Sequence, residues 1–358
     1  MKRLLSVVIV ALLMLGMSTM AFRIQPATSS IIGDLTGGTS NPWDFVPDGM
    51  VDGKDITIVA LCFGSAPGCP PPYIWNPHCD VNGDGKVDGK DIATVALNYG
   101  QGARTLAGWR SSPYELQQEK DPGYWVNVAK DMASKIRNSV PSGVWILGED
   151  MGSQCHLTFD SSVAYPNVVF SKTDENEKYL DAFDAVGLKV WLQVEPADAN
   201  VDTLIDLVLQ RYHHHSCVTG FGVDVEWLQP DRYPDGRAVT SEEAQRWLSK
   251  VRSYDPNYQL FLKHWLVEKM PTAYAAGTVF VDDSQGFRDM NELADEFNQW
   301  ATHFWPSKVY FQIGYASDQG WWSKLADPYQ TITDKLTSEN PNCNGVYWVD
   351  FTLKTLYP

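Results

Sequence analysis

The 358-residue sequence predicts an α/β protein in which a (β/α)8 TIM-like barrel follows a small all-α module. The barrel is predicted because short apolar segments alternate with amphipathic helical segments over about 250 residues toward the C-terminus. The module is predicted because a 17-residue segment occurs twice, at 48–64 and 84–100, with twelve identical positions. Such a repeat indicates two like supersecondary units.

Eight segments of the barrel region have the composition of buried strands, and we expect helices between them. The strands are expected at 143–150, 167–170, 189–196, 219–230, 258–265, 278–285, 308–315 and 344–351, with helices including 175–187, 201–212 and 240–252. The last helix begins with Thr240 and Glu243 at the spacing of a capping box. A doubly wound open sheet is the alternative. It usually carries a glycine-rich phosphate turn after its first strand, and "GEDMGSQ" is not one.

The N-terminus has the pattern of a secretory signal peptide. Lys2 and Arg3 precede an apolar run, which small residues follow up to Ala21. An uncleaved membrane anchor is the alternative. We therefore expect a secreted or cell-surface protein with a signal at 1–21, a linker at 22–40, the repeat module at 41–102, a second linker at 103–112 and the barrel at 113–358.

Net charge and cysteine content limit the possible binding partners of the protein and indicate its redox environment. The net charge of −16 makes nucleic acid or an anionic membrane an unsuitable partner. Export permits disulfides, and Cys69 and Cys79 are the expected pair because they bracket a proline-rich loop. Cys155, Cys217 and Cys343 lie far along the chain, and free buried thiols are one reading of these three.

The second copy of the repeat contains an EF-hand-type calcium loop. Counted from Asp80, oxygen-bearing side chains fall at loop positions 1, 3, 5, 9 and 12, with Gly85 at the sharp turn. Calcium is a hard cation that needs several oxygen ligands around one point. The predicted ligands are Asp80, Asn82, Asp84, Asp88 and Asp91, with the backbone carbonyl of Lys86 at position 7.

The first copy keeps the same spacing less completely. Its predicted ligands are Asp44, Asp48, Asp52 and Asp55, with the carbonyl of Met50 in the place of Lys86. Val46 replaces the oxygen ligand at position 3, and Pro47 stiffens the loop. We expect this copy to bind calcium weakly, through water, or not at all.

Two such loops, each followed by an apolar helical segment ("ITIVALCFG" and "IATVALNYG"), resemble a dockerin module over residues 41–102. The resemblance implies a module that folds on binding calcium and docks onto a cohesin-like protein. Gly53-Lys54 and Gly89-Lys90 stand where many dockerins carry Ser or Thr for cohesin recognition. A structural calcium-bound module on a cell-surface protein is therefore the alternative.

The stretch "TGFGVDVEWLQP" (219–230) places two acids in a strand. Because side chains alternate along a strand, Asp224 and Glu226 share one face and Val223 and Val225 share the other. The acids then point into the barrel near the carboxyl end of the strand, where barrel active sites are built. An internal ion pair with Lys263 or an arginine is the alternative.

Other strand ends carry acids, amides and aromatic residues, which together suit a sugar. Polar groups bond the hydroxyls, and aromatic faces stack on the rings. The predicted substrate-binding residues are Glu149, Gln193, Glu195, Lys263, Trp265, Gln312, Tyr315, Trp348 and Asp350. For any single tryptophan a place in the core is the simpler reading.

"TGFGVDVEW" resembles the fourth-strand signature of the family 18 chitinases, Asp-Gly-x-Asp-x-Asp-x-Glu. Gly220, Asp224 and Glu226 match it, and Thr219 and Gly222 replace the other two aspartates. Family 25 lysozymes and hyaluronidases also end this strand in Asp-x-Glu. The resemblance implies that Glu226 protonates the leaving oxygen while Asp224 orients the 2-acetamido group of the substrate. "GVYWVD" resembles the chitinase segment whose Trp floors the sugar site, which points to Trp348.

The sequence therefore predicts a secreted glycosidase that acts on a polysaccharide containing amino sugars, with calcium as a structural cofactor of the module and none for the barrel. Glu226 is the predicted general acid/base and Asp224 the orienting carboxylate. Asp282 or Asp283 is the candidate where a separate nucleophile or base is needed. A non-catalytic glycan-binding or cell-surface structural protein is the alternative.

Two further features suggest other chemistries. The run His213–His215 invites a zinc site, which we do not expect because neighbouring histidines at a helix C-terminus cannot easily face one ion. Lys263 could serve as a Schiff-base amine, as in barrel aldolases, but neutralising a carboxylate is the commoner use of such a lysine.

Overall fold

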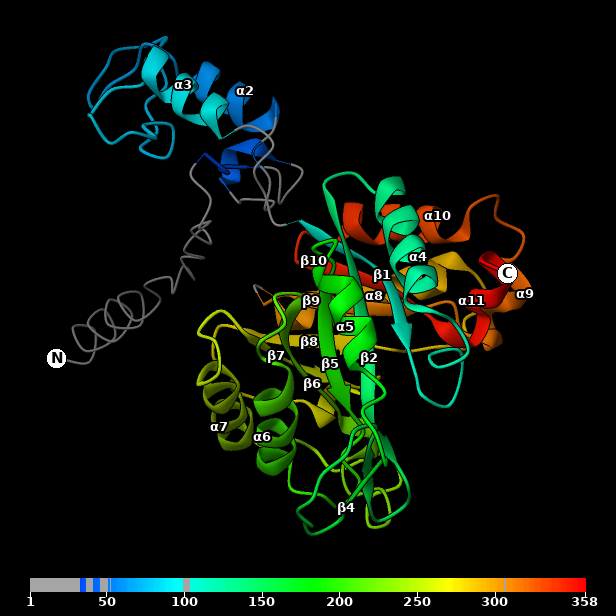
Figure 1. Cartoon of the computed structure of the whole chain (residues 1–358). Coiled ribbons are helices and arrows are strands. Elements are labelled where there is room, and N and C mark those ends of the chain that lie inside the picture. Colours follow the sequence, from blue (N-terminus) through cyan, green and yellow to red (C-terminus); the bar gives the residue numbers. More distant parts are fainter. Residues whose placement is uncertain (1–32, 37–40, 46–50, 52, 99–103, 306) are drawn as a thin grey trace, which may run out of the picture.

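The computed structural model describes residues 33–36, 41–45, 51, 53–98, 104–305 and 307–358, and its C-terminal part is a closed barrel (Figure 1). Eight parallel strands follow one another around the barrel, and pairing of the last with the first closes the ring. The predicted fold class is therefore confirmed. The strands are β1 Thr105–Ser111, β2 Ser139–Asp150, β5 Lys189–Val194, β6 Val218–Asp224, β7 Gln259–Lys263, β8 Thr278–Asp282, β9 Val309–Ile313 and β10 Cys343–Val349.

Helices cover the outside of the ring (Figure 1). They are α4 Pro122–Lys135, α5 Glu177–Asp184, α6 Val201–Tyr212, α7 Ser241–Arg252, α8 Met290–Phe304, α9 Gln319–Trp322, α10 Pro328–Glu339 and α11 Asp350–Leu356. The capping box expected from Thr240 and Glu243 is present at the start of α7. Residues 264–277, all of them described, contain only the 3-10 turn η3 Val267–Lys269, so β7 and β8 are joined without an α-helix.

Two expectations about the strands are corrected. The barrel opens with β1, which lies inside the segment 103–112 that the sequence indicated as a linker. This strand is inconspicuous because two of its positions on one face are Gly108 and Arg110, which lowers its apolar content. Residues 167–170, expected as a barrel strand, fall mostly in β4 Val168–Phe170. That strand pairs with β3 Cys155–Leu157 beside the ring.

The inside of the barrel is filled by an apolar plug. Its members come from strands all around the ring and are Val144, Trp191, Phe261, Val279, Val281, Tyr310 and Tyr347. Gly220 and Gly222 of β6 leave room for it, because a Cβ at Gly220 would meet Trp191 and one at Gly222 would meet Phe261. An aspartate at position 222 therefore has no space, which accounts for one departure from the chitinase-like signature.

The N-terminal module contains α2 Gly53–Leu61 and α3 Gly89–Leu97, and Figure 1 shows it apart from the barrel. Its small core includes Ile58 and Val59 from α2 and Val95 from α3. Leu35 packs against this core, and Asp34 and Thr36 are buried. The expected linker 22–40 is thus corrected at 33–36, because these residues are part of the module.

The disulfide of the module joins Cys62 to Cys79, not Cys69 to Cys79. Both bonded cysteines are fully buried in the module core, whereas Cys69 is partly exposed and its thiol contacts the carbonyl of Tyr73. Cys62 is buried just after the end of α2 and meets Cys79 in the module core. The proline-rich loop between them lies outside this core. The three late cysteines are free and buried, as one reading of the sequence held.

No helix in the described part of the chain combines the length and apolar character needed to cross a bilayer. The signal expected at 1–21 lies outside the described residues, as does most of the segment 22–40.

Candidate active site

A cavity of about 510 Å³ opens at the carboxyl ends of the barrel strands. Its lining combines acids, cations and aromatic rings: Arg110, Tyr114, Glu149, Asp150, Met151, Glu195, Glu226, Trp227, Lys263, Asp283, Gln285, Tyr315 and Phe351. Two larger hollows of about 550 and 610 Å³ lie toward the amino ends of the strands, and each is lined by a single carboxylate. Only a cavity with several carboxylates suits acid/base chemistry, so this carboxyl-end cavity is the candidate site.

Lys263, near the end of β7, is the centre of the cavity floor. Its Nζ lies 2.9 Å from Oδ2 of Asp224 and 3.8 Å from Oε2 of Glu226. It also forms an ion pair and a short hydrogen bond with Oδ2 of Asp283. The ion pair with Lys263, which the sequence left as an alternative, is therefore present. One ammonium is therefore shared by three carboxyl groups.

Burial and the neighbouring charges shift the pKa values of the acids and of Lys263. Burial raises the pKa of Glu226 despite the opposing charge of Lys263, and Asp283 and Glu195 raise it further. Burial likewise raises the pKa of Asp224 well above its usual range. Burial opposes the charge on Lys263, but the carboxylates of Asp224 and Asp283 outweigh it and raise the lysine pKa. A carboxylic acid kept protonated near neutral pH beside a charged partner is what a general acid requires.

Asp224 and Glu226 occupy different levels of the site. Asp224 is the last residue of β6, is fully buried, and accepts a hydrogen bond of 3.1 Å from the Gln193 amide. Glu226 lies in the 3-10 turn η2 Val225–Trp227, where the side chain is 28% exposed. Both acids lie near Lys263, although Glu226 is past the end of β6, and only Glu226 lines the cavity.

Glu195 forms a second charged group at the rim. Its carboxylate accepts a hydrogen bond of 2.8 Å from the Tyr114 hydroxyl and one of 3.0 Å from the backbone N–H of Asp150. Arg110 in turn donates to the Tyr114 hydroxyl at 2.7 Å. The chain of contacts holds Glu195 in place on the side of the cavity from which Tyr114 projects.

Asp350, at the start of α11, lies behind Arg110 and does not line the cavity. It accepts hydrogen bonds from the backbone N–H of Ser112 at 2.7 Å and from its hydroxyl, and Arg110 Nη1 is 3.4 Å away. Burial raises the pKa of Asp350 to about 6, although Arg110 and Ser112 oppose the shift. Asp350 therefore contacts Arg110 and Ser112 and is not part of the cavity lining.

The raised pKa of Asp350 makes stability depend on pH. Because its pKa in the folded chain is above the unfolded value of about 3.9, the favourable contribution is complete below pH 4 and is lost as pH rises through 6. Between pH 4 and 7 the wild type should lose about 2 kcal/mol more unfolding free energy than Asp350→Asn. Urea denaturation at both pH values checks this, and equal losses would contradict it.

Three residues expected at the site face elsewhere, and these expectations are corrected. Trp348 is fully buried on the helix side, where its indole N–H donates to Thr352 and its ring packs against Trp322. Trp265 stacks on His264 outside the cavity lining. Asp282 is fully buried and accepts from the backbone of Ser284, and alternation along β8 turns it away from its neighbour Asp283.

The other predicted residues lie in or directly under the cavity. Glu149 lines it and pairs with Nδ1 of His156 at 2.6 Å. Tyr315 also lines it, and its hydroxyl donates to the Gln312 amide oxygen at 3.3 Å. Gln312 and Gln193 are fully buried below the floor. Oδ1 of Asp224 and of Asp283 find no hydrogen-bond partner among the described residues, as expected where a ligand completes the network.

Several lining residues could not be assigned from the sequence. Arg110 was missed because residues 103–112 were predicted to be a linker, although the alternation of Leu106, Gly108 and Arg110 is a strand signal. Tyr114 lies just after this segment, and no local pattern marked it. Trp227 directly follows the acid pair and was the nearest available aromatic signal. Phe351 comes from α11, and no local pattern marks it as part of the site.

The second repeat loop has the form expected of a calcium loop. Asp80 accepts from the backbone N–H of Asp84 at 3.0 Å and of Gly85 at 2.9 Å, and Asn82 accepts from the N–H of Asp84. Asp91 accepts from the N–H of Asn82 at 3.1 Å. These bonds curl the loop, and its residue types fit a hard cation.

The first repeat loop is described only in part. Asp48, Met50 and Asp52 lie outside the described residues. Asp44 is exposed in η1 Pro42–Asp44, and its carboxylate accepts from the side chain of Asn41 at 2.8 Å. Asp55 accepts from the backbone N–H groups of Leu35 at 2.7 Å and Thr36 at 3.0 Å. The backbone N–H of Thr36 thus donates to Asp55 in the same way as the backbone N–H of Asn82 donates to Asp91.

Comparison with known proteins adds little beyond the barrel. No family model matches the chain, and no curated protein gives a significant match. An endo-β-mannanase/endo-β-glucanase from Prevotella bryantii is 10% identical, with a TM-score of 0.39 over 68% of this chain and 44% of its own. This chain thus spans less than half of that protein.

Two further solved structures are similarly distant. A putative α-L-fucosidase from Bacteroides thetaiotaomicron is 11% identical, with a TM-score of 0.43 over 70% of this chain and 86% of its own. A family 5 glycoside hydrolase from Prevotella bryantii is 9% identical, with a TM-score of 0.39 over 69% and 88%. Because these likenesses are weak, the barrel rests on its own strand pairing, and function rests on the cavity.

Proposed function

We propose that the chain is a glycosidase whose active site is the cavity at the carboxyl ends of the barrel strands. The observation that carries the proposal is Glu226, a half-buried carboxyl group with a raised pKa that faces the cavity beside a second carboxylate, Asp283. Glycoside hydrolysis needs this pair, one group to protonate the leaving oxygen and one to act as nucleophile or base.

In this proposal Glu226 is the general acid/base. Asp283, ion-paired with Lys263, is the second carboxylate at the cavity surface. Asp224 lies beneath them, fully buried, and holds Lys263 in place. This differs from the role that the chitinase resemblance implied for Asp224, since a fully buried carboxylate contacts a 2-acetamido group only if the floor opens.

The same geometry disfavours Lys263 as a Schiff-base amine. A Schiff base forms through a neutral amine. Three carboxylates within 3.8 Å of Nζ keep Lys263 as an ammonium ion, and its pKa is raised, not lowered. Lys263 is therefore assigned to charge balance.

The substrate class follows from the lining. Trp227, Tyr315 and Phe351 offer ring faces, while Arg110 and Glu195 offer hydrogen bonds at the rim, as a sugar chain requires. We propose an exported enzyme acting on a polysaccharide that contains amino sugars. Digestion of chitin, peptidoglycan and galactosaminoglycan fragments, followed by product analysis, tests this. Binding without cleavage of any fragment would favour the non-catalytic glycan-binding alternative.

We also propose that the N-terminal module binds calcium as a structural cofactor and serves for attachment to a cohesin-like protein or a cell surface. Asp80→Asn keeps an acceptor for the backbone of Asp84 but removes a ligand charge, so calcium affinity should fall about tenfold or more. Calorimetric titration of the full chain measures the affinity. EDTA should also lower the melting temperature of the module.

Leu97→Ala is the control, because Leu97 is exposed on α3 and lies outside the predicted ligand set. In the first loop, the contacts of Asp55 favour Asp34 over Asp44 as the opening ligand. Asp34→Asn should then weaken any second calcium site while Asp44→Asn leaves it unchanged. Equal affinity of Asp80→Asn and wild type would refute the calcium assignment.

A further inference from the structure

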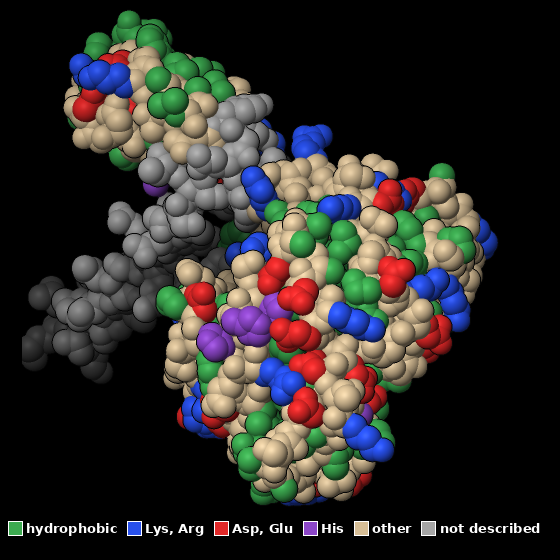
Figure 2. Space-filling view, in the orientation of Figure 1, with side chains coloured by type: hydrophobic (Ala, Val, Ile, Leu, Met, Phe, Trp, Pro, Cys, Tyr) green, Lys and Arg blue, Asp and Glu red, His purple; other side chains and the backbone are tan. Residues whose placement is uncertain are grey.

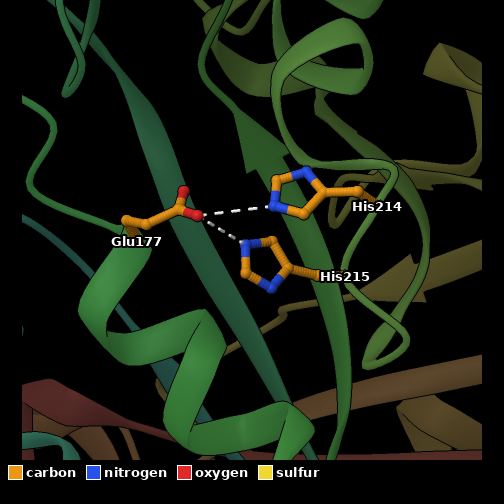
Figure 3. A group of neighbouring side chains, drawn as sticks. All are labelled: Glu177, His214 and His215. Carbon is orange, nitrogen blue, oxygen red and sulfur yellow. Dashed lines mark ion pairs between the residues drawn. The ribbon is translucent and has the colours of Figure 1, made fainter.

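A second cluster of titratable side chains lies away from the cavity, between α5 and the turn that follows α6. Oε1 of Glu177 is 3.4 Å from Nε2 of His214 and 3.4 Å from Nε2 of His215 (Figure 3). The three donor atoms all lie within 4.8 Å of one another. Figure 2 shows histidine side chains in purple next to acidic side chains in red on this face of the barrel.

The expectation that neighbouring histidines diverge is corrected here. Helix α6 ends at Tyr212, so His214 and His215 are in the turn and not on a helical surface. Their ring centroids lie 4.1 Å apart and both present Nε2 to the same carboxylate oxygen. The two side chains are therefore not spread apart by the geometry of a helix.

His215 is held in one orientation by its other ring nitrogen. Nδ1 lies 2.7 Å from Oδ2 of Asp184, whose second oxygen accepts from the backbone N–H of Cys217 and the hydroxyl of Ser216. Since a carboxylate can only accept, the Nδ1 proton faces Asp184 and Nε2 of a neutral ring carries a lone pair. A carboxylate behind a histidine is the usual support of a metal-binding imidazole.

Nε2 of His215 is left in an unfavourable position without a cation. His215 is only 2% exposed, and its Nε2 finds no hydrogen-bond partner among the described residues. The lone pair instead faces an oxygen of Glu177, so two acceptors oppose each other. A positive charge between them removes both the repulsion and the unmet polar group.

The two distances from Glu177 match a tetrahedral metal. Bonds of about 2.0–2.1 Å at the tetrahedral angle place neighbouring donor atoms about 3.4 Å apart. Glu177 and Asp184 bring two negative charges, which a divalent ion offsets. Two imidazoles and one carboxylate suit zinc-like ions and not calcium or magnesium, which take oxygen ligands.

We propose that Glu177, His214 and His215 bind one divalent transition-metal ion of the zinc type, with water in the fourth position. Glu177 is 45% and His214 is 55% exposed, so water reaches the ion. Asp184 supports His215 from behind. The ion ties the N-terminal end of α5 to the turn before β6, and its effect is on the stability of the barrel wall, separate from the glycosidase cavity.

An overlapping set, Asp184, His215 and Cys217, is a poorer alternative. It would use Nδ1 of His215, which already contacts Asp184. The Cys217 thiol is buried and donates to the carbonyl of Leu180, so it is turned to the backbone of α5.

The test uses the full chain without an affinity tag, saturated with calcium to fill the repeat loops, and titrated with Zn²⁺ by calorimetry at pH 7.5. Co²⁺ is the spectroscopic probe. We expect one zinc site, an intense tetrahedral Co²⁺ absorption band, and a higher melting temperature with Zn²⁺. His214→Gln and Glu177→Gln should each weaken Zn²⁺ binding at least about tenfold and remove the band.

His213→Gln is the matched control, because His213 belongs to the same run but its Nδ1 contacts the carbonyl of Leu209 instead of the cluster. It should bind Zn²⁺ as the wild type does. The proposal is overturned if the wild type binds no Zn²⁺ at micromolar concentration, in which case a proton on His215 bridges the two carboxylates. Equal Zn²⁺ affinity in all three variants would also overturn it.

Discussion

Glu226→Gln is expected to lower kcat on an unactivated glycan by a factor of about 10² to 10⁴, with KM little changed. Glutamine has the same shape but no proton to give to the leaving oxygen. Glu226 has a raised pKa because of burial and the nearby acids Asp283 and Glu195. The wild type should therefore lose kcat/KM on the alkaline side as Glu226 deprotonates, and the variant should lack that limb. Initial rates across pH measure both effects.

Substrates with different leaving groups separate this role from simple structural damage. An aryl glycoside with an acidic phenol leaves without protonation, so Glu226→Gln should retain much more of its activity on that substrate. Asp283→Asn should lose activity on both substrates, because attack at the sugar precedes or accompanies leaving in either case. Glu242→Gln, in the exposed first turn of α7, is the control with unchanged rates. Unaltered kcat in Glu226→Gln would refute the assignment.

The sequence predicted the barrel because its signals are local. Buried parallel strands such as β6 and β9 are continuous apolar runs, and α7 has its capping box within four residues. β1 lacked such a run because glycine and arginine face inward there, and its place in the ring depends on pairing with β10, some 240 residues away in sequence.

The acid pair was found from the sequence because alternation along one strand puts Asp224 and Glu226 on one face. The different depths of the two acids in the site could not be predicted, because they depend on where β6 ends and η2 begins. Trp348 illustrates the limit of a motif, because β10 carries both inward and outward aromatic side chains. Tyr347 enters the barrel plug, and Trp348 packs under the helices. A one-residue difference in facing decides between a substrate platform and a core residue.

The Cys62–Cys79 bridge and the Glu177–His214–His215 cluster escaped prediction for a shared reason. Each depends on where a helix ends. Cys62 lies just past α2, and the two histidines lie just past α6, and helix ends are the least reliable part of a sequence reading. Spacing alone favoured the nearer cysteine pair and a divergent histidine run.

Lys263→Met should lower the unfolding free energy at pH 7 by about 3–5 kcal/mol, because it leaves two buried carboxylates without their shared cation. Asp224 and Asp283 are both almost completely buried, and Asp224 has Gln193 as its other hydrogen-bond partner. Removing the ammonium raises the pKa of Asp224 beyond its already raised value. A carboxyl group with a raised pKa loses its favourable contribution as pH increases, so the defect should be smaller at pH 5 than at pH 7.

A surface ion pair provides the comparison that isolates burial as the cause. Lys250 lies 2.6 Å from Asp206 on the outside of the barrel, where both side chains are partly exposed. Lys250→Met should therefore cost at most about 1 kcal/mol at either pH. Adding Asp224→Asn to Lys263→Met should restore part of the lost stability, since a neutral amide needs no cation. If Lys263→Met costs no more than Lys250→Met, the floor is open to water, and burial does not raise the pKa of Glu226.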